Sequence, residues 1–184
     1  RTMESFRIEA TRYLADHDKV LKAILGYFSN IPGVDGQFLS GSTASNVMDE
    51  DSDLDIGILF QSAEEREQIW QRRWDWEMAP WFHRFDADHI KPHFVIYLFE
   101  PQIKADISLY LENELPPVEG GPYTIVWDQQ AVLGRWIERL STNRQTPEPD
   151  WLGVAHEDER FWGWLFYLYT HAHRGEYYDS AYEF

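Results

Sequence analysis

The chain has 184 residues, enough for one domain of ordinary size or for one domain with a small appendage. Hydrophobic residues make up 43% and aromatic residues 16%, a composition that excludes the disordered class and permits a substantial core. The 32 acidic and 16 basic side chains give a formal net charge of -16. This charge argues against duplex DNA or RNA as a partner, because it repels a polyanion.

The absence of Cys and of long apolar runs narrows the possible classes of protein further. The sequence has no Cys, which excludes disulfides, thiolate zinc sites and Cys nucleophiles and fits a reducing compartment. No apolar run approaches the ~20 residues of a membrane span, and the first residues are polar, unlike those of a signal peptide. We therefore expect a soluble, cytoplasmic protein without membrane contact.

The first half of the chain predicts helices around two strands. Residues 5–29 carry apolar side chains close to the helical repeat, which indicates one helix or two. Pro and Gly residues then end the helix, and residues 37–40 form a short strand candidate. Residues 53–60 open with two charges and continue as an apolar strand. Residues 63–78 favour a helix with an apolar stripe, which Pro80 makes difficult to continue.

The second half begins with a predicted hairpin. Residues 93–99 are rich in β-branched and aromatic side chains, and residues 103–111 alternate clearly after a turn. This alternation places Asp106 in the middle of a strand, on its polar face. Residues 123–127 suggest a last strand, and Asp128 is placed to cap a helix that runs to about residue 140.

A polar stretch at residues 141–150, which contains two Pro, is the best candidate for a linker. It separates a domain over residues 1–140 from residues 151–184. Within the latter, residues 156–173 predict a helix that is apolar on most sides and must therefore be covered. We expect the start of a helical C-terminal domain that is incomplete here or completed by a partner.

Two carboxylates one residue apart open the strand at residues 53–60. Because residues i and i+2 of a strand point to the same face, Asp53 and Asp55 project together while their neighbours face the core. Asp106 can join them from a neighbouring strand. Carboxylates held together raise each other's pKa, and hard divalent cations such as Mg²⁺ take carboxylate oxygens as ligands. The three residues therefore predict a metal site.

Other motifs fit these residues less well. Alternate acidic residues from Asp49 to Asp55 suggest a calcium loop, but the sixth position of that loop is Leu54 instead of Gly and the twelfth is Phe60 instead of Glu. The P-loop, the dinucleotide fingerprint and the hydrolase elbow are all absent from the sequence.

The sequence resembles the nucleotidyltransferases of the DNA polymerase β superfamily. Their signature is Gly-Ser, a ten-residue gap, Asp-x-Asp and a later strand Asp, and it is matched by Gly41-Ser42, Asp53-Leu54-Asp55 and Asp106. The closest likeness is to the small antibiotic adenylyltransferases of the aminoglycoside and lincosamide group. The resemblance covers about residues 35–140 and, more weakly, the aromatic helix that ends at residues 173–176. It implies an α/β (α+β) polymerase β-like domain with a mixed sheet and a C-terminal helical segment.

The resemblance also implies roles for the acidic residues. Nucleotidyl transfer is an in-line displacement at the α-phosphorus of a nucleoside triphosphate, in which carboxylates hold one or two metal ions. Asp53 and Asp55 would be ligands of Mg²⁺. Asp106 would be the third ligand or the general base, and in related enzymes the base can instead come from the helical domain. The candidates there are Glu157, Asp158 and Glu159.

Phosphate binding would fall to Gly41 and Ser42, and Lys104 is placed to neutralise phosphate charge. The implied reaction transfers AMP from Mg·ATP to a hydroxyl of a small molecule, with an aminoglycoside- or lincosamide-type antibiotic as the leading acceptor. An acidic surface suits a polycationic acceptor. Trp76 or Trp81 would line an acceptor pocket if they are not part of the core.

Two other functions stay open at this point. One is a minimal nucleotidyltransferase that modifies a protein or an RNA, as in toxin–antitoxin pairs. The other is a nucleotide-binding module without turnover, against which the three intact Asp residues argue. The sequence also leaves open the nucleotide base, the general base and whether a homodimer completes the site.

Overall fold

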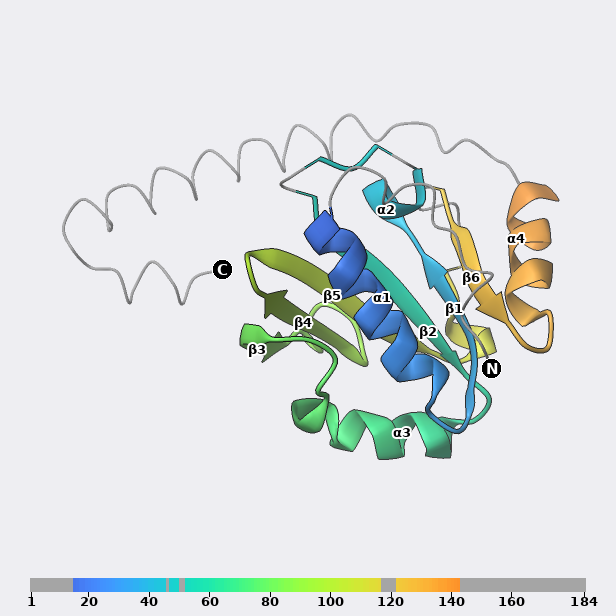
Figure 1. Cartoon of the computed structure of the whole chain (residues 1–184). Coiled ribbons are helices and arrows are strands. Elements are labelled where there is room, and N and C mark those ends of the chain that lie inside the picture. Colours follow the sequence, from blue (N-terminus) through green and yellow to red (C-terminus); the bar gives the residue numbers. More distant parts are fainter. Residues whose placement is uncertain (1–14, 46, 50–51, 117–121, 143–184) are drawn as a thin grey trace, which may run out of the picture. The chain divides into compact units, whose positions relative to one another are not determined.

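The computed structural model describes residues 15–45, 47–49, 52–116 and 122–142. This part of the chain forms a six-stranded mixed sheet with helices on both faces, in the strand order β3-β4-β5-β2-β1-β6 (Figure 1). In chain order the elements are α1 (Ala15–Ser29), β1 (Val34–Leu39), α2 (Gly41–Ser45), β2 (Leu54–Phe60), α3 (Ala63–Gln71), η3 (Arg73–Asp75), β3 (Trp81–Asp86), β4 (Phe94–Phe99), β5 (Ile103–Tyr110), η4 (Glu112–Glu114), β6 (Thr124–Asp128) and α4 (Val132–Thr142).

This architecture confirms the predicted α/β class with a mixed sheet. The predicted hairpin is present as β4 and β5, which pair antiparallel across a turn that contains a cis peptide bond between Glu100 and Pro101. The linker from residue 143 onward and the helical segment at residues 151–184 lie outside the described residues, as do residues 1–14. None of the described helices is both long and apolar enough to cross a membrane.

One face of the sheet carries the main core. The alternation of β2 directs Leu54, Ile56 and Ile58 to this face, where α1 packs on them. The buried residues of α1 recur at the helical repeat and form one stripe: Val20, Leu21, Ile24, Leu25 and Phe28. Each such side chain, fully buried, contributes roughly 1.5–3 kcal/mol, so this layer holds the sheet in place.

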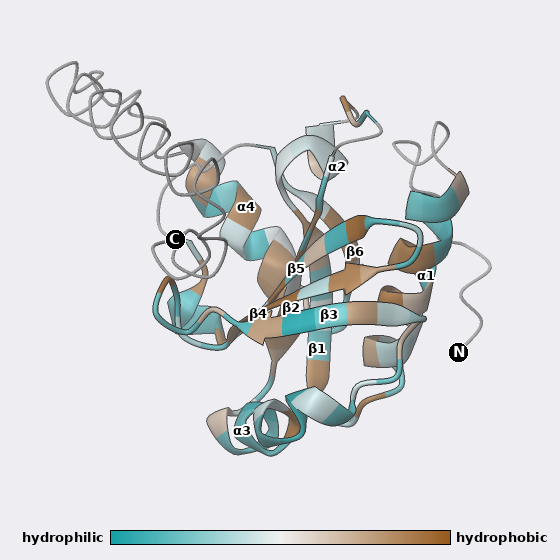
Figure 2. Ribbon diagram, turned by 90° about the vertical axis from the view of Figure 1, so that its left-hand side faces the viewer, coloured by the Kyte–Doolittle hydropathy of each residue, from teal (hydrophilic) through white to brown (hydrophobic). Residues whose placement is uncertain are grey.

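The other face is covered by α4 near β1 and β6. Phe38 and Leu59 point to this face and pack with Trp136 in a second cluster. Figure 2 shows α1 and α4 on opposite sides of the sheet. The predicted capping role of Asp128 holds, although α4 begins only at Val132, because the Asp128 carboxylate accepts a hydrogen bond of 2.8 Å from the Gly134 N–H. The polar residues of β2 and β5 lie on this second face.

The predicted helix over residues 63–78 is shorter in the structure. It ends at Gln71 and is followed by the single turn η3, because the chain must carry Trp76 into the core. Trp76 is 1% exposed, stacks on Tyr97 and meets Phe28 edge-on. Trp76 is therefore a core residue and not part of an acceptor pocket.

Gly57 of β2 is required by the close approach of the Phe38 ring. A Cβ atom at this position would lie 2.2 Å from Phe38 Cζ, in a packed region where Phe38 is 2% exposed. We expect Gly57→Ala to lower the free energy of unfolding by about 1–3 kcal/mol through overpacking, measured by urea denaturation. Gly134→Ala in α4 is the matched control, because its Cβ would meet only Asp128 Oδ2 at 3.5 Å. This control should gain up to about 1 kcal/mol of helix propensity. An unchanged urea midpoint for Gly57→Ala would contradict the packing argument.

Candidate active site

Three carboxylates meet where β2 and β5 lie side by side. Asp53 directly precedes β2, Asp55 lies within it, and Asp106 is the register partner of Asp55 on the parallel strand β5. One oxygen atom from each carboxylate lies within 4.8 Å of the others. All three side chains are partly exposed, so the cluster is open to solvent and ligands.

The Lys104 ammonium group lies among these carboxylates. Its Nζ atom is 2.8 Å from Asp53 Oδ2 and 3.0 Å from Asp106 Oδ2, with hydrogen-bond geometry in both contacts. Asp106 Oδ1 is also near, at 2.9 Å, but this contact lacks hydrogen-bond geometry and the buried atom has no hydrogen-bond partner. One side chain therefore supplies the positive charge closest to the cluster.

Burial and like charges shift the proton affinities of this cluster. Burial raises the pKa of Asp55 above its ordinary value, and the charges of Asp53 and Asp106 raise it further. Burial also raises the pKa of Asp106, although Lys104 opposes the rise. For Lys104 itself burial lowers the pKa, but the hydrogen bonds and charges of Asp53 and Asp106 outweigh burial and raise it overall. The positive charge of Lys104 therefore does not fully offset the effect of partial burial on the pKa of Asp55 and Asp106.

The residues predicted to form a phosphate-binding turn form the short helix α2. This helix and the residue before it contact Asp53 and Asp55. Gly41 begins α2 with a φ of 61°, and a Cβ atom there would lie 2.3 Å from Asp55 Oδ2. Only Gly combines this backbone conformation with that approach. The Thr43 hydroxyl donates to the Asp53 carbonyl at 3.1 Å, and the Ser40 N–H donates to the Asp55 carbonyl at 3.1 Å. Ser42 follows Gly41 in the first turn of α2.

The loop before Asp53 is held by α1. The buried side chain of His17 has its Nε2 atom 3.0 Å from the Ser52 carbonyl oxygen, across 35 positions of the chain. His17 therefore joins the main core to the residue that precedes the first carboxylate. No sequence pattern indicates this contact, since an isolated His within a helix has no local signal.

The donor set fits a hard divalent cation. Oxygen atoms from three carboxylates converge within the reach of one ion, and Mg²⁺ prefers such ligands together with water and phosphate oxygens. The Lys104 ammonium shows that the position already favours a cation. Asp106 Oδ1, buried without a hydrogen bond, is an acceptor that an ion would satisfy.

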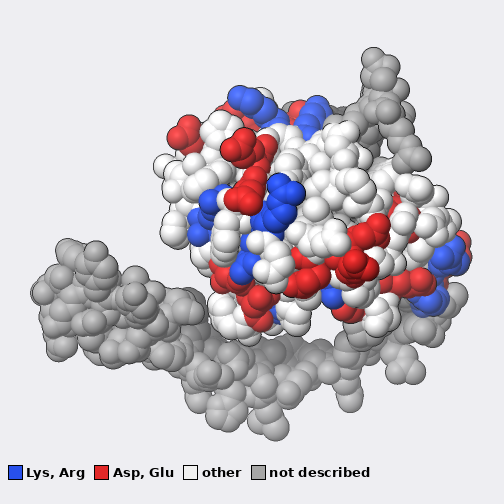
Figure 3. Space-filling view, turned by 90° about the horizontal axis from the view of Figure 1, so that it is seen from below, with Lys and Arg blue, Asp and Glu red and all other residues white. Residues whose placement is uncertain are grey.

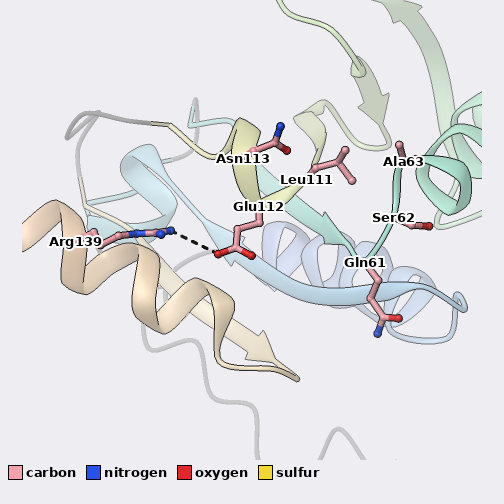
Figure 4. A pocket seen from close by; sticks show the side chains of 7 residues that line it. All are labelled: Gln61, Ser62, Ala63, Leu111, Glu112, Asn113 and Arg139. Atoms are coloured by element: carbon pink, nitrogen blue, oxygen red, sulfur yellow. Dashed lines mark ion pairs between the residues drawn. The ribbon is translucent and has the colours of Figure 1, made fainter.

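A small cavity of about 70 Å³ adjoins Asp55 and Asp106. It continues along the two strands past Gly57 and Ser108. A wider hollow of about 440 Å³ lies beyond the other ends of β2 and β5, where Arg139 and Glu112 approach to 3.8 Å (Figure 4). Gln61 in that hollow is six residues from Asp55, or roughly 20 Å along the strand. The cluster of three carboxylates therefore adjoins the smaller cavity and is distant from the wider hollow.

The structure brings together most of the residues singled out from the sequence. Asp53, Asp55, Asp106 and Lys104 form one cluster, and Gly41 contacts it. Trp81 lies elsewhere, on the edge strand β3, and is 38% exposed. The three alternative base residues at 157–159 are outside the described part of the chain. The sequence did not indicate Lys91, Ser108 or Tyr110, which also line the cavity.

Known proteins resemble this chain to different degrees. A solved structure of the E. coli MS115-1 CdnC:HORMA-deltaN complex is similar to it with 13% sequence identity and a TM-score of 0.34, a likeness too low to carry an argument. The match covers 77% of this chain, which spans about half (49%) of the other. No curated protein matches the sequence. The family model of the nucleotidyltransferase domain matches residues 17–118. Because that match spans more than half of the chain, the protein belongs to the nucleotidyltransferase domain family.

Proposed function

We propose that the protein transfers AMP from ATP to a hydroxyl group of a small molecule, in a reaction that requires Mg²⁺. The observation that supports this proposal is the convergence of Asp53, Asp55 and Asp106 beside the Gly41 turn. Residues 1–140 would form the catalytic domain, followed by a linker at residues 141–150 and the start of a helical domain.

The three carboxylates would hold the metal. When bound, Mg²⁺ would supply positive charge that stabilises the phosphate oxygens during the displacement. The carboxylates fix its position, and their shared negative charge makes the site selective for a cation over a neutral ligand. Asp106 has a second role open to it. Because burial raises its pKa, Asp106 is a stronger proton acceptor than an ordinary Asp and can take the proton of the attacking hydroxyl.

The turn at Gly41 and Ser42 would bind the β- and γ-phosphates. Gly41 has no side chain to obstruct the approach, and the backbone N–H groups and the Ser42 hydroxyl offer donors to phosphate oxygens. In the displacement the acceptor oxygen bonds to the α-phosphorus, the bond to pyrophosphate breaks, and the acceptor proton passes to a carboxylate. Lys104, released from the carboxylates, would neutralise charge on the departing phosphates.

The acceptor proposed first is an aminoglycoside- or lincosamide-type antibiotic. The net charge of -16 would favour encounter with a polycation. Figure 3, which views the molecule from below, shows acidic and basic side chains interspersed on that face, so the attraction there is not concentrated in one acidic patch.

Labelled ATP provides the direct test of this function. The protein is incubated with ATP, Mg²⁺ and a panel of aminoglycosides and lincosamides, and pyrophosphate and labelled products are measured. Labelled antibiotic is the expected result. Label on a protein or an RNA would instead support the alternative acceptor, and an absence of pyrophosphate under every condition would contradict nucleotidyl transfer from ATP.

Asp55→Asn tests the site assignment. It removes one charge from the metal site while preserving the shape of the side chain, so we expect transfer to fall by at least about 10²–10³-fold, as when one preorganised electrostatic group is lost. The melting temperature without metal should not fall, because the mutation removes repulsion among the carboxylates. Asp18→Asn is the control, since Asp18 pairs with Lys22 on the exposed side of α1. Asp55→Asn with normal activity would contradict the assignment.

Lys104→Met tests whether the Lys104 ammonium group and the metal ion compete for the same carboxylate oxygens. Because Lys104 neutralises Asp53 and Asp106, its loss should lower the melting temperature of metal-free protein. Added Mg²⁺ should then raise the melting temperature more in Lys104→Met than in the wild type, where Lys104 competes for the same oxygens. A ligand at 100 times its Kd stabilises by about 2.7 kcal/mol, which thermal unfolding detects readily. Equal responses to Mg²⁺ and to chelator in both proteins would contradict the competition.

A further inference from the structure

The small cavity beside the carboxylates has a defined shape. Gly57 of β2 and Ser108 of β5 are part of its lining, and Phe38, Phe94 and Tyr110 supply aromatic surface. The volume of about 70 Å³ is several times the ~10–15 Å³ that one water requires. It has room for the edge of a ring that carries a hydroxyl group, but not for a whole sugar or base.

Ser108 is a buried polar group that points into this cavity. It is 5% exposed and lies on the same face of β5 as Asp106, two residues further along the strand. Because Ser108 lines the cavity, its hydroxyl group can hydrogen-bond a ligand there.

Lys91 brings a positive charge to the same cavity. Its ammonium group donates to the Tyr110 hydroxyl at 2.8 Å and lies 4.9 Å and 5.0 Å from the ring centres of Phe94 and Tyr110. These aromatic faces are therefore already engaged with a cation. A ligand ammonium at this end of the cavity would meet a like charge, whereas a hydroxyl oxygen could accept a hydrogen bond from Lys91.

The position of the cavity favours the acceptor over the nucleotide. The Gly41 turn lies at the start of β2, while the cavity extends from Asp55 and Asp106 toward the ends of β2 and β5. An in-line displacement requires the attacking oxygen and the leaving pyrophosphate to lie on opposite sides of the α-phosphorus. With the pyrophosphate at the turn, the attacking oxygen approaches from the side of the cavity.

We propose that this cavity binds an uncharged, hydroxyl-bearing edge of one sugar ring of the acceptor, and that Lys91 and Ser108 select such an edge over one that carries an amino group, whatever charge the rest of the acceptor bears outside the cavity. The proposal rests on the proposed function, because it names the acceptor class of the same site. Ser108 and Lys91 hydrogen-bond hydroxyl groups that neighbour the reacting one. They are specificity-determining residues, while the bond to phosphorus and the proton transfer remain as described above.

The test uses two probes that differ only in one ring substituent, glucose with its 2-hydroxyl group and glucosamine with a 2-ammonium group. Binding of each to the full chain is measured by saturation-transfer NMR, which does not depend on turnover, and transfer is measured with labelled ATP and Mg²⁺. The variants are Ser108→Ala and Lys91→Met. The control is Lys22→Met, which removes an exposed Lys of α1 that pairs with Asp18. Melting temperatures establish that each variant is folded.

We expect the wild type to bind the neutral sugar more tightly than glucosamine. Ser108→Ala should weaken binding of the neutral sugar about fivefold, as for the loss of one hydrogen bond. Lys91→Met should shift the preference toward glucosamine at least about fivefold, with the KM for ATP changed less than about twofold. Lys22→Met should behave as the wild type.

Three results would overturn the proposal. The first is a wild-type protein that binds neither sugar or prefers glucosamine. The second is that the Ser108→Ala and Lys91→Met variants bind both sugars as the wild type does. The third is that these variants show a higher KM for ATP instead of weaker sugar binding. The last result would assign the cavity to the ribose of the nucleotide. Slow release of pyrophosphate from ATP without any sugar reports the nucleotide half of the reaction separately, so its absence would count against the proposed function and not against the cavity.

Discussion

The parallel pairing of β2 with β5 is the constraint on which the site depends. It places Asp55 opposite Asp106, and because side chains alternate along a strand, a slip of one residue would turn one carboxylate into the core under α1. The other neighbouring strands in the described sheet are antiparallel. Parallel neighbours need a long crossover connection, and here α3, β3 and β4 form it.

Electrostatics explains why this register needs support from the rest of the fold. Three carboxylates within 4.8 Å repel one another, and partial burial strengthens the repulsion. Lys104 offsets part of it, and the apolar faces of β2 and α1 supply the stability that keeps the strands in place. The sheet therefore maintains a charge arrangement that an isolated hairpin could not, and that arrangement is what makes the position suitable for a divalent cation.

Regular alternation made much of the fold predictable. The strands predicted at residues 53–60 and 103–111 are present within one residue at each end, and so the convergence of their three Asp residues could be expected. Strand β3 was not predicted, because most of its residues are exposed and it depends on pairing with β4. Lys91 was not found either, since a single Lys between elements has no periodic signal and reaches Tyr110 only through the tertiary fold.

The attachment of α2 to β2 has a consequence for cooperativity. Two hydrogen bonds and the contact at Gly41 tie the turn to both Asp53 and Asp55, so local opening of the turn would release both carboxylates at once. The turn and the two carboxylates would then open together, as one cooperative unit of local unfolding. Ligands bound at the two parts of that unit would stabilise each other reciprocally, by linkage, without the movement of a domain.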